Sequence, residues 1–327
     1  MKKIKVSFLW CSDIENQLFY KILEKFSNNR LVISDIKSCD ILFIGTYDFD
    51  YYSIKRKFFN KFANKKRFDF LKKYFFNLDL YSLRNYKPIR VFVTTENFRN
   101  DGQLKYDYSI TPELGITEKN HLRFQIWKES LDWSHEDIDH LNVSNAKRYG
   151  KLIKIENLKK PLGKNFLSRA REFSFFTSHL NEPRKSIYDV FNKNFKVHGY
   201  GPLFNKKIKS HNSGNFVKKD ILKNFAFNLC PNNSLYPGYY TEGVVDSFDS
   251  GCLPVTWADQ NIGHDFNTRS FINLNNYVID NFSEICENLK DDLFLNKFTT
   301  EPLLLSDPDI NLEIKFAKSI LNNFYGS

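Results

Sequence analysis

The chain has 327 residues, of which 42% are hydrophobic and 26% charged, and it contains 13 glycines and 10 prolines. This composition excludes a collagen-like or an intrinsically disordered chain, and the length favours two globular domains. Because no apolar run approaches about 18 residues, a membrane-spanning helix is excluded as well. The basic start, Lys2-Lys3, precedes an apolar run too short for a signal peptide, so we expect a first β-strand there.

The first half of the chain carries the alternating pattern of a parallel α/β domain. Apolar runs and helical spacing predict a strand, a helix and a second strand at residues 5–10, 14–26 and 41–45. A further β-branched strand is predicted at residues 89–95, and a polar loop that begins with Glu96 follows it directly. Catalytic groups in open α/β sheets gather at such carboxyl ends of strands.

Most of the formal charge of +10 lies in one basic, aromatic segment. Residues 55–73 hold nine lysines and arginines against one acid, Asp69, and phenylalanines at helical spacing run through residues 55–76. Three interpretations stay open for this segment. It lies on an anionic membrane surface, it binds nucleic acid through phosphates and stacking, or it is a surface helix whose aromatic stripe packs on its own domain.

The second half repeats the α/β pattern after a lysine-rich stretch at residues 151–165, which we interpret as a linker. The remaining predicted elements are a strand at 172–177, a helix at 217–227, a helix at 241–250 capped by Gly251, a strand at 252–257 and a final helix after Asp307. Two such units predict an α/β protein with two Rossmann-like domains facing a cleft. We place these domains at residues 1–160 and 161–327, with the basic insert at 51–87 inside the first.

Neither the cysteines nor the histidines form a metal-binding pattern. The five cysteines are scattered without a C-x-x-C pair, which predicts free thiols in a reducing compartment. His135 and His140 are spaced H-E-x-x-x-H, which turns them apart on a helix. The D-x-D tripeptide Asp48-Phe49-Asp50 is short enough to occur by chance. We therefore predict no metal site.

The block at residues 219–273 carries the clearest chemical signal. A glycine-containing loop that ends in Pro237-Gly238-Tyr239-Tyr240-Thr241-Glu242-Gly243 leads into an apolar helix with Thr241 as its expected N-cap. The unpaired N–H groups at such a helix start form a ready site for a diphosphate. Many α/β proteins contain such a loop without a ligand, so this pattern alone leaves the ligand open.

Short motifs in a consistent order connect this block to the rest of the chain. They are VTTEN at 93–97, YDYSI at 106–110, RFQIW at 123–127, NEPR at 181–184, NLCPNNS at 228–234, GYYTE at 238–242, LPVTW at 253–257 and DFNTRSF at 265–271. These stretches resemble the motifs of the α-1,3/4-fucosyltransferases of glycosyltransferase family 10, especially the bacterial ones, which include TGEN, NLCFENS, GYVTEK and DFNPKSF. The resemblance covers about residues 85–280.

The resemblance implies a GT-B fold with an N-terminal acceptor domain and a C-terminal nucleotide-sugar domain. It also implies an inverting transfer of L-fucose from GDP-fucose, without a metal or another cofactor. By motif position, Glu96 would be the general base and Arg184 would hold the diphosphate. The donor site would be lined by Asn233, Tyr239, Thr241 and Glu242.

The chain departs from the family pattern around this donor site. The lysine that follows the family's Thr-Glu pair, a phosphate contact, is Gly243 here, and the family's Phe-Glu dipeptide is Pro231-Asn232. Candidate replacements for the phosphate contact are Lys218, Lys219 and Lys223. The alternatives are therefore a different activated sugar donor, or a degenerate protein that binds glycans or anionic surfaces without turnover.

For the biological setting, we expect a cytoplasmic α-1,3-fucosyltransferase that lies peripherally on the inner face of the membrane through residues 55–76. The expected acceptor is an oligosaccharide or lipid-linked glycan, such as a lipopolysaccharide O-chain. Nucleic acid is not expected as a partner.

Overall fold

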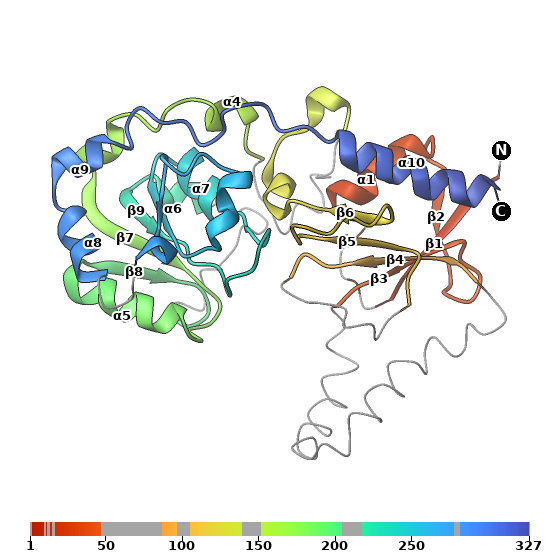
Figure 1. Cartoon of the computed structure of the whole chain (residues 1–327), viewed down its shortest axis with the longest axis horizontal. Coiled ribbons are helices and arrows are strands. Elements are labelled where there is room, and N and C mark those ends of the chain that lie inside the picture. Colours follow the sequence, from red (N-terminus) through yellow and green to blue (C-terminus); the bar gives the residue numbers. More distant parts are fainter. Residues whose placement is uncertain are drawn as a thin grey trace, which may run out of the picture. The chain divides into compact units, whose positions relative to one another are not determined.

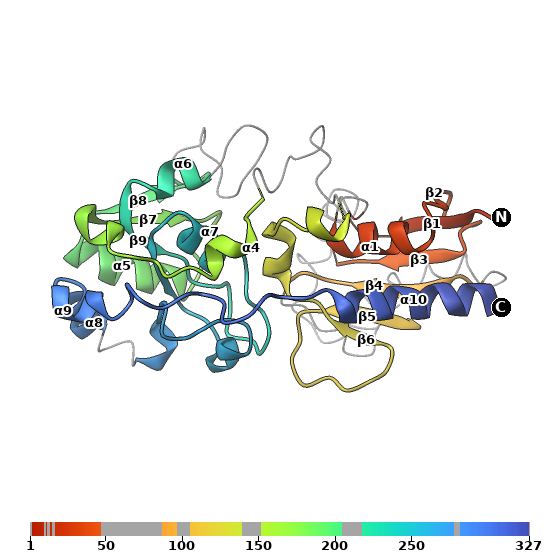
Figure 2. The same ribbon diagram turned by 90° about the horizontal axis from the view of Figure 1, so that it is seen from above.

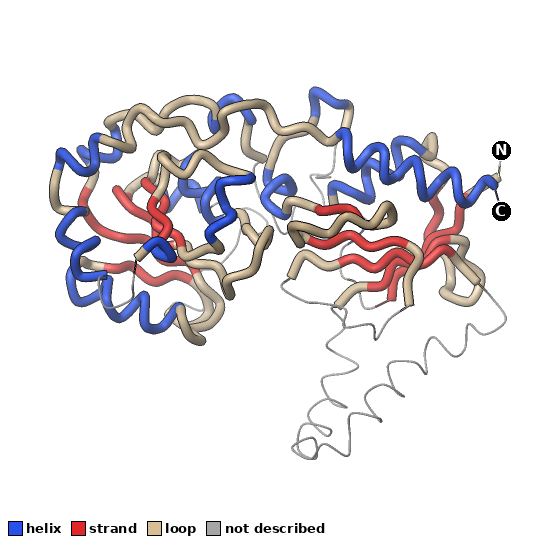
Figure 3. Tube along the Cα trace, in the orientation of Figure 1, coloured by secondary structure: helices blue, strands red, loops and turns tan. Residues whose placement is uncertain are grey.

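A computed structural model of the chain describes residues 2–9, 11, 14, 17–46, 87–96, 105–138, 152–204, 218–277 and 282–326. The basic segment 55–76, the D-x-D tripeptide at 48–50 and His140 lie outside these residues. The described chain forms two parallel β-sheets with helices packed on them, and Figure 3 shows the strands of each sheet. Every helix in the described ranges falls short of the length and apolar character needed to cross a bilayer.

The described residues fall into two compact units. Unit 1 comprises Met1–Thr111, Gly115–Phe124 and Ile310–Ser327, and unit 2 comprises Pro112–Leu114 and Gln125–Asp309, each as far as the chain is described. The border that we expected at 160/161 falls inside unit 2, and the last segment of the chain returns to unit 1. Each unit contains one of the two sheets.

Unit 1 is built on a six-stranded parallel sheet in the order β2-β1-β3-β4-β5-β6. Its strands are β1 (Ile4–Leu9), β2 (Leu31–Ile33), β3 (Ile41–Ile44), β4 (Ile89–Val93), β5 (Tyr108–Thr111) and β6 (His121–Arg123). The structure confirms the predicted strands β1, β3 and β4. The strands β2, β5 and β6 were not predicted from the sequence, and they lack the uninterrupted four-residue apolar run of β3. All residues of β3 are buried, as expected for an inner strand of a parallel sheet.

Two helices cover one face of this sheet. α1 (Leu18–Phe26) packs over β1, and α10 (Asn311–Gly326) packs over β5 through an edge-to-face contact between Tyr108 and Phe316. The helices also touch each other through Phe19 and Phe316, and Figures 1 and 2 show them side by side. The first helix begins later than predicted, at Leu18, and the predicted C-terminal helix is confirmed.

Unit 2 is built on a second parallel sheet in the order β11-β10-β9-β7-β8. Its strands are β7 (Ala170–Phe176), β8 (Val197–Tyr200), β9 (Phe225–Leu229), β10 (Leu253–Thr256) and β11 (Ile272–Asn273). Its helices are α4 (Ile155–Leu158), α5 (Arg184–Asn194), α6 (Lys218–Leu222), α7 (Gly243–Asp249), α8 (Phe282–Asn288) and α9 (Asp292–Asn296). Short 3-10 turns lie at Ile126–Ser130, Ser134–Glu136, Asn165–Ser168, Gln260–His264 and Leu274–Asn276. The two parallel sheets confirm the predicted pair of Rossmann-like domains.

Two predictions for unit 2 are wrong. The helix predicted at 217–227 is only the short α6, because Phe225–Leu229 form β9, a fully buried strand between β7 and β10. Periodicity alone does not separate a short buried strand from a buried helix. The stretch at 151–165 is not a linker, since Leu158 is fully buried and its carbonyl accepts the N–H of Leu304.

Candidate active site

Arg184 lies at the carboxyl ends of two adjacent inner strands of unit 2. It is the first residue of α5, and its Nε and Nη2 atoms donate to the carbonyl of Pro231 at 3.2 and 3.1 Å. Its Nη1 atom donates to Oγ1 of Thr177 at 3.2 Å. Thr177 follows β7 and Pro231 follows the neighbouring β9. Ligands of open α/β sheets bind beyond such strand ends, so the guanidinium stands where an anionic ligand group would arrive.

A histidine that the sequence analysis did not single out stands beside this arginine. Nε2 of His179 lies 3.3 Å from Nη1 of Arg184. The backbone carbonyl of His179 accepts the hydroxyl of Thr177 at 2.7 Å, so the imidazole belongs to the same group of side chains. No motif marks His179, and only its position just after the predicted strand at 172–177 could have pointed to it.

The loop after β9 is held by the buried side chain of Asn232. Its Nδ2 atom donates to the carbonyl of Tyr239 at 3.1 Å, and its Oδ1 atom accepts the hydroxyl of Thr241 at 3.1 Å. Its backbone N–H donates to the carbonyl of Trp257 at 3.0 Å, beyond the end of β10. Nδ2 of Asn233 donates to the phenol oxygen of Tyr239 at 3.3 Å. The loop thus brings three predicted site residues together, and the sequence had marked Asn232 only as a departure from the family.

The same loop makes a close contact that requires glycine. Gly238 has a φ of +95°, and a Cβ atom on it would lie 2.0 Å from the carbonyl oxygen of Pro112. The N–H of Leu114 donates to the carbonyl of Pro237 at 3.0 Å. The segment Pro112–Leu114 therefore fixes the turn from which Tyr239 projects.

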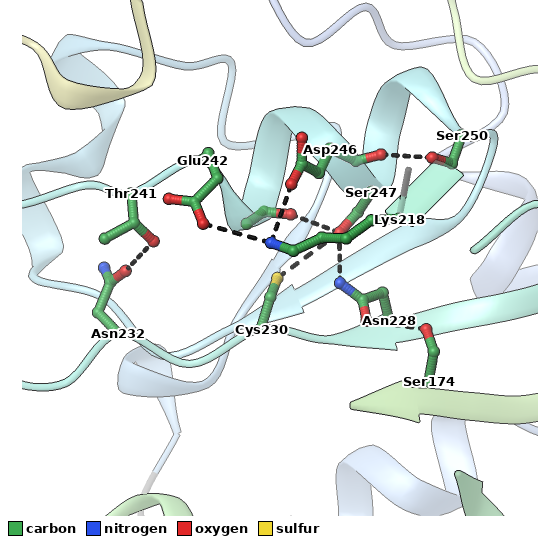
Figure 4. Close-up of polar contacts among 11 residues, drawn as sticks. Ser174, Lys218, Asn228, Cys230, Asn232, Thr241, Glu242, Asp246, Ser247 and Ser250 are labelled. Carbon is green, nitrogen blue, oxygen red and sulfur yellow. Dashed lines mark hydrogen bonds and ion pairs between the residues drawn. The ribbon is translucent and has the colours of Figure 1, made fainter. Parts of the chain in front are cut away.

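A buried ion-pair cluster lies at the start of α7, and Figure 4 shows its polar contacts. Nζ of Lys218, from α6, is 3.3 Å from Oε1 of Glu242 and 3.0 Å from Oδ2 of Asp246. The side chains of Lys218 and Asp246 are 7% and 8% exposed, whereas that of Glu242 is 32% exposed. The cluster therefore has a buried end and one end that solvent reaches.

Burial and neighbouring charges set the ionisation of this cluster. Burial lowers the pKa of Lys218, but the carboxylates of Asp246 and Glu242 outweigh this effect and hold the pKa above its usual value. The pKa of Asp246 is raised to about 6, mainly by burial and also by the neighbouring carboxylate of Glu242, while the ammonium of Lys218 acts to lower it. The ammonium of Lys218 is therefore charged and pairs with two carboxyl groups, as a buried charge requires.

The start of α7 differs from the prediction. The helix begins at Gly243, so Thr241 is not its N-cap; Glu242 holds that position, and its side chain caps no N–H group. A Cβ atom on Gly243 would lie 3.0 Å from Cβ of Cys230, so glycine lets the helix start approach the end of β9. The predicted cap at the other end is confirmed, because Gly251 has a φ of +70° and its N–H donates to the carbonyl of Phe248.

The other two candidate phosphate-binding lysines also lie beside carboxylates. Nζ of Lys219 is 2.6 Å from Oδ2 of Asp249, whose side chain is buried. Nζ of Lys223 is 3.4 Å from Oδ1 of Asp220 in a pair at the surface. Each of the three lysines therefore has an acidic partner in this structure.

In unit 1, Glu96 follows the carboxyl end of β4, as the sequence predicts. Its N–H donates to Oγ1 of Thr94 at 3.1 Å, and the Thr94 hydroxyl lies 3.3 Å from that of Thr46, which follows β3. The strands β3 and β4 are neighbours, so the two threonines tie their ends together beside Glu96. Glu96 is half-buried and stands at the sheet edge where ligands of parallel sheets bind.

Metal-binding geometry is absent from the described part of the chain. Within those ranges, no group of three or more His, Cys, Asp or Glu residues is placed to hold a metal ion. His135 of the H-E-x-x-x-H sequence stacks on Trp133, with ring centroids 5.8 Å apart. This histidine therefore packs as an aromatic side chain.

Comparison with known proteins connects the chain with one family of enzymes. Residues 167–297 match the family model described as glycosyltransferase family 10 (fucosyltransferase) C-term. The chain is also 29% identical over 264 residues to the alpha-(1,3)-fucosyltransferase FucT of Helicobacter pylori, a match that covers 72% of this chain and 53% of that protein. The chain is therefore similar to glycosyltransferase family 10, and the match to the family model lies in its second half. It spans about half the length of this curated relative.

Solved structures share the fold of this chain over its whole length. A crystal structure of α1,3-fucosyltransferase is 21% identical with a TM-score of 0.65, and one of α1,3-fucosyltransferase with GDP-fucose is 20% identical with a TM-score of 0.63. Each match covers 100% of this chain and 91% of the other. The likeness confirms the predicted GT-B fold class.

The family 10 C-terminal model covers the whole group of candidate residues in unit 2. Arg184, the Asn232 loop and the Lys218 cluster all fall within residues 167–297. Glu96 lies outside that range, so its assignment depends on the VTTEN motif and on its place at the end of β4.

Proposed function

We propose that this chain is a member of glycosyltransferase family 10 and an inverting α-1,3-fucosyltransferase, which moves L-fucose from GDP-fucose to a hydroxyl of a surface glycan. The family match, the likeness to FucT and the fold shared with a protein crystallised with GDP-fucose support this function. The observation that carries the proposal is the position of Arg184, whose guanidinium lies at the ends of β7 and β9 beside the loop of Asn233 and Tyr239.

In this proposal, Arg184 holds the diphosphate of the donor. A planar guanidinium forms paired hydrogen bonds with phosphate oxygens and neutralises the charge that grows as GDP leaves. Other residues line the donor site, namely Asn233, Tyr239, Thr241 and Glu242. Lys219 and Lys223 stay candidate phosphate contacts, which would require each to leave its carboxylate partner.

Glu96 is the proposed general base. Its carboxylate takes the proton of the acceptor hydroxyl while that oxygen bonds to the anomeric carbon and the bond from that carbon to GDP breaks. Attack opposite the leaving group inverts the anomeric configuration. A positioned base of this kind contributes about 10²–10⁴-fold to the rate.

A second candidate function keeps the fold and uses a different activated sugar. The observation in its favour is Gly243, where the family lysine is missing and Cys230 stands 3.0 Å from the place of a Cβ atom. Binding of a glycan or an anionic surface without turnover is the remaining alternative.

We further propose a cytoplasmic protein that lies peripherally on the inner face of the membrane and acts on a lipid-linked acceptor such as a lipopolysaccharide O-chain. The support is the charge of residues 55–73, nine cationic side chains against one acid, since such segments are attracted to anionic lipid. No metal or other cofactor is part of the proposed reaction.

Calorimetric titration of the purified chain with GDP, GDP-fucose, UDP, CDP and CMP tests the donor. We expect micromolar binding of GDP, weaker binding of the other nucleotides, and tighter binding when fucose is attached. A preference for another nucleotide would establish the second candidate function. If nothing binds, the catalytic function is wrong.

A further inference from the structure

The buried cluster at α7 points to a role for Lys218 other than phosphate contact. We propose that Lys218 and Asp246 are positioning residues that fix the carboxylate of Glu242 in the donor site, and that the Lys218 ammonium contacts no phosphate. This inference rests on the proposed function, which places Glu242 in that site.

The three side chains of the cluster differ in their exposure to solvent. Lys218 and Asp246 are almost fully buried, whereas about a third of the Glu242 side chain is exposed. Figure 4 shows the Lys218 side chain reaching from α6 to a point between the two carboxylates. A ligand that approaches the start of α7 therefore meets Glu242, with the ammonium behind it.

Two carboxylates lie close together at the start of α7. Asp246 is four residues after Glu242, a spacing at which carboxylates share a helix face and repel each other. Lys218 lies within 3.3 Å of both and offsets this repulsion. Without the ammonium, the exposed carboxylate of Glu242 would turn towards water and away from Asp246.

α7 itself is held against the sheet by hydrogen bonds and close packing. Nδ2 of Asn228, on β9, donates to Oγ of Ser247 at 2.7 Å, and Oγ of Ser174, on β7, donates to Oδ1 of Asn228 at 2.8 Å. Gly243 also lies against Cys230. Because these contacts fix the helix, Lys218 acts on the rotamer of Glu242 and not on the position of α7.

A direct phosphate contact would break this arrangement. The Lys218 ammonium would have to leave Asp246, whose buried carboxylate would then lose its cation. Leaving one member of a buried ion pair without its partner is strongly unfavourable. The pair of Lys218 and Asp246 therefore positions Glu242 and does not supply a cation for phosphate.

A double-mutant cycle on the full chain tests the inference. Calorimetric affinity for GDP-fucose is compared in the parent, Lys218→Met, Glu242→Gln and the double variant, with Lys159→Met as the matched control. Lys159 also pairs with an aspartate, Asp307, but at the surface. We expect each of the first two variants to bind about tenfold more weakly, the double variant to bind like Glu242→Gln, and the control to bind like the parent.

Other outcomes separate the two proposals. If Lys218→Met loses the same factor in the Glu242→Gln background as in the parent, Lys218 contacts the donor directly and the positioning role is wrong. The role is also wrong if Lys218→Met binds like the parent. If Lys218→Met fails to fold, Lys218→Gln takes its place in the same cycle, with the same expectation, because it also removes the ammonium. If the parent binds no GDP-fucose at all, the proposed function itself fails.

Discussion

The proposed site residues in the two units are held in different ways. In unit 2, the side chains themselves are fixed: Arg184 bonds to the ends of two strands, and Lys218 is locked between carboxylates. In unit 1, the threonines at the ends of β3 and β4 fix the backbone turn that carries Glu96. Both arrangements suit the proposed chemistry, because a diphosphate needs charged groups that are already in place and a general base needs a defined position beside the acceptor hydroxyl.

The largest expected effect comes from Glu96→Gln. This variant keeps the size of the side chain and removes its basicity, so we expect the fucosyl transfer rate to fall about 10³-fold while GDP-fucose affinity stays within twofold. Transfer assays and calorimetry measure the two quantities. Glu118→Gln, a change at an exposed glutamate of the same unit, is the control and should transfer at the parent rate. Equal activity of Glu96→Gln and the parent would remove Glu96 from the mechanism.

Arg184→Ala should act on binding instead. Losing two charge-assisted hydrogen bonds, each worth about 1.5–3 kcal/mol, predicts at least a 100-fold loss of GDP affinity. Arg269→Ala, which removes an arginine with a 71% exposed side chain from a surface ion pair, should leave GDP affinity unchanged. The assignment of Arg184 to the diphosphate is wrong if both variants bind GDP equally well.

Gly238→Ala tests the contact between the loop and Pro112. The substitution combines a strained φ with a Cβ atom 2.0 Å from a carbonyl oxygen, so we expect the free energy of unfolding to fall by about 2 kcal/mol or more. Gly115→Ala is a matched control, since Gly115 has a similar φ of +86° but nothing within 4 Å of its Cβ position. If denaturant titrations show that both variants lose the same free energy of unfolding, the close approach to Pro112 does not contribute to stability.

The smallest expected effect is on the pH dependence of stability. Burial raises the pKa of Asp246 from 3.8 to about 6, so the folded chain binds this proton more tightly than the unfolded chain. Its contribution to stability is therefore largest near pH 4 and is lost as pH rises through 6. Lys218, Glu242 and Asp249 are the charged groups that act on it.

Unfolding midpoints of the parent and Asp246→Asn, measured from pH 4.5 to 7.5, isolate this contribution. The midpoint of the parent relative to the variant should decrease as the pH rises. If the difference between the midpoints of the parent and the variant stays constant over this pH range, Asp246 does not titrate within it.

Sequence periodicity predicted those elements whose pattern is long or distinct. The strand at β4 and the C-terminal helix α10 followed from β-branched and helical patterns, and both are present. The helix predicted at 217–227 was wrong because the apolar stretch that begins at Phe225 is short, and periodicity does not separate a short buried strand from a buried helix segment. Burial decides between the two, and burial depends on neighbours that a local pattern does not contain.

Some residues of the candidate site could be predicted from the sequence, and others could not. Motifs located Arg184, Tyr239 and Glu242 by their order in the chain. Two of their partners could not be predicted, because Thr177 follows another strand and Lys218 comes from another helix. Which side chains meet at one end of a sheet follows from strand order, and strand order is a property of the whole unit.

The return of the last helix to unit 1 has a consequence for biosynthesis. The ribosome releases a chain from its N-terminus at about 5–20 residues per second, so α10, at Asn311–Gly326, leaves after the strands of unit 2. Every strand of unit 2 has by then been synthesised, whereas the apolar surface of α1 around Phe19 still lacks its cover. The nascent protein therefore completes its second domain before its first, and the unfinished first domain is the part that chaperones would have to shield.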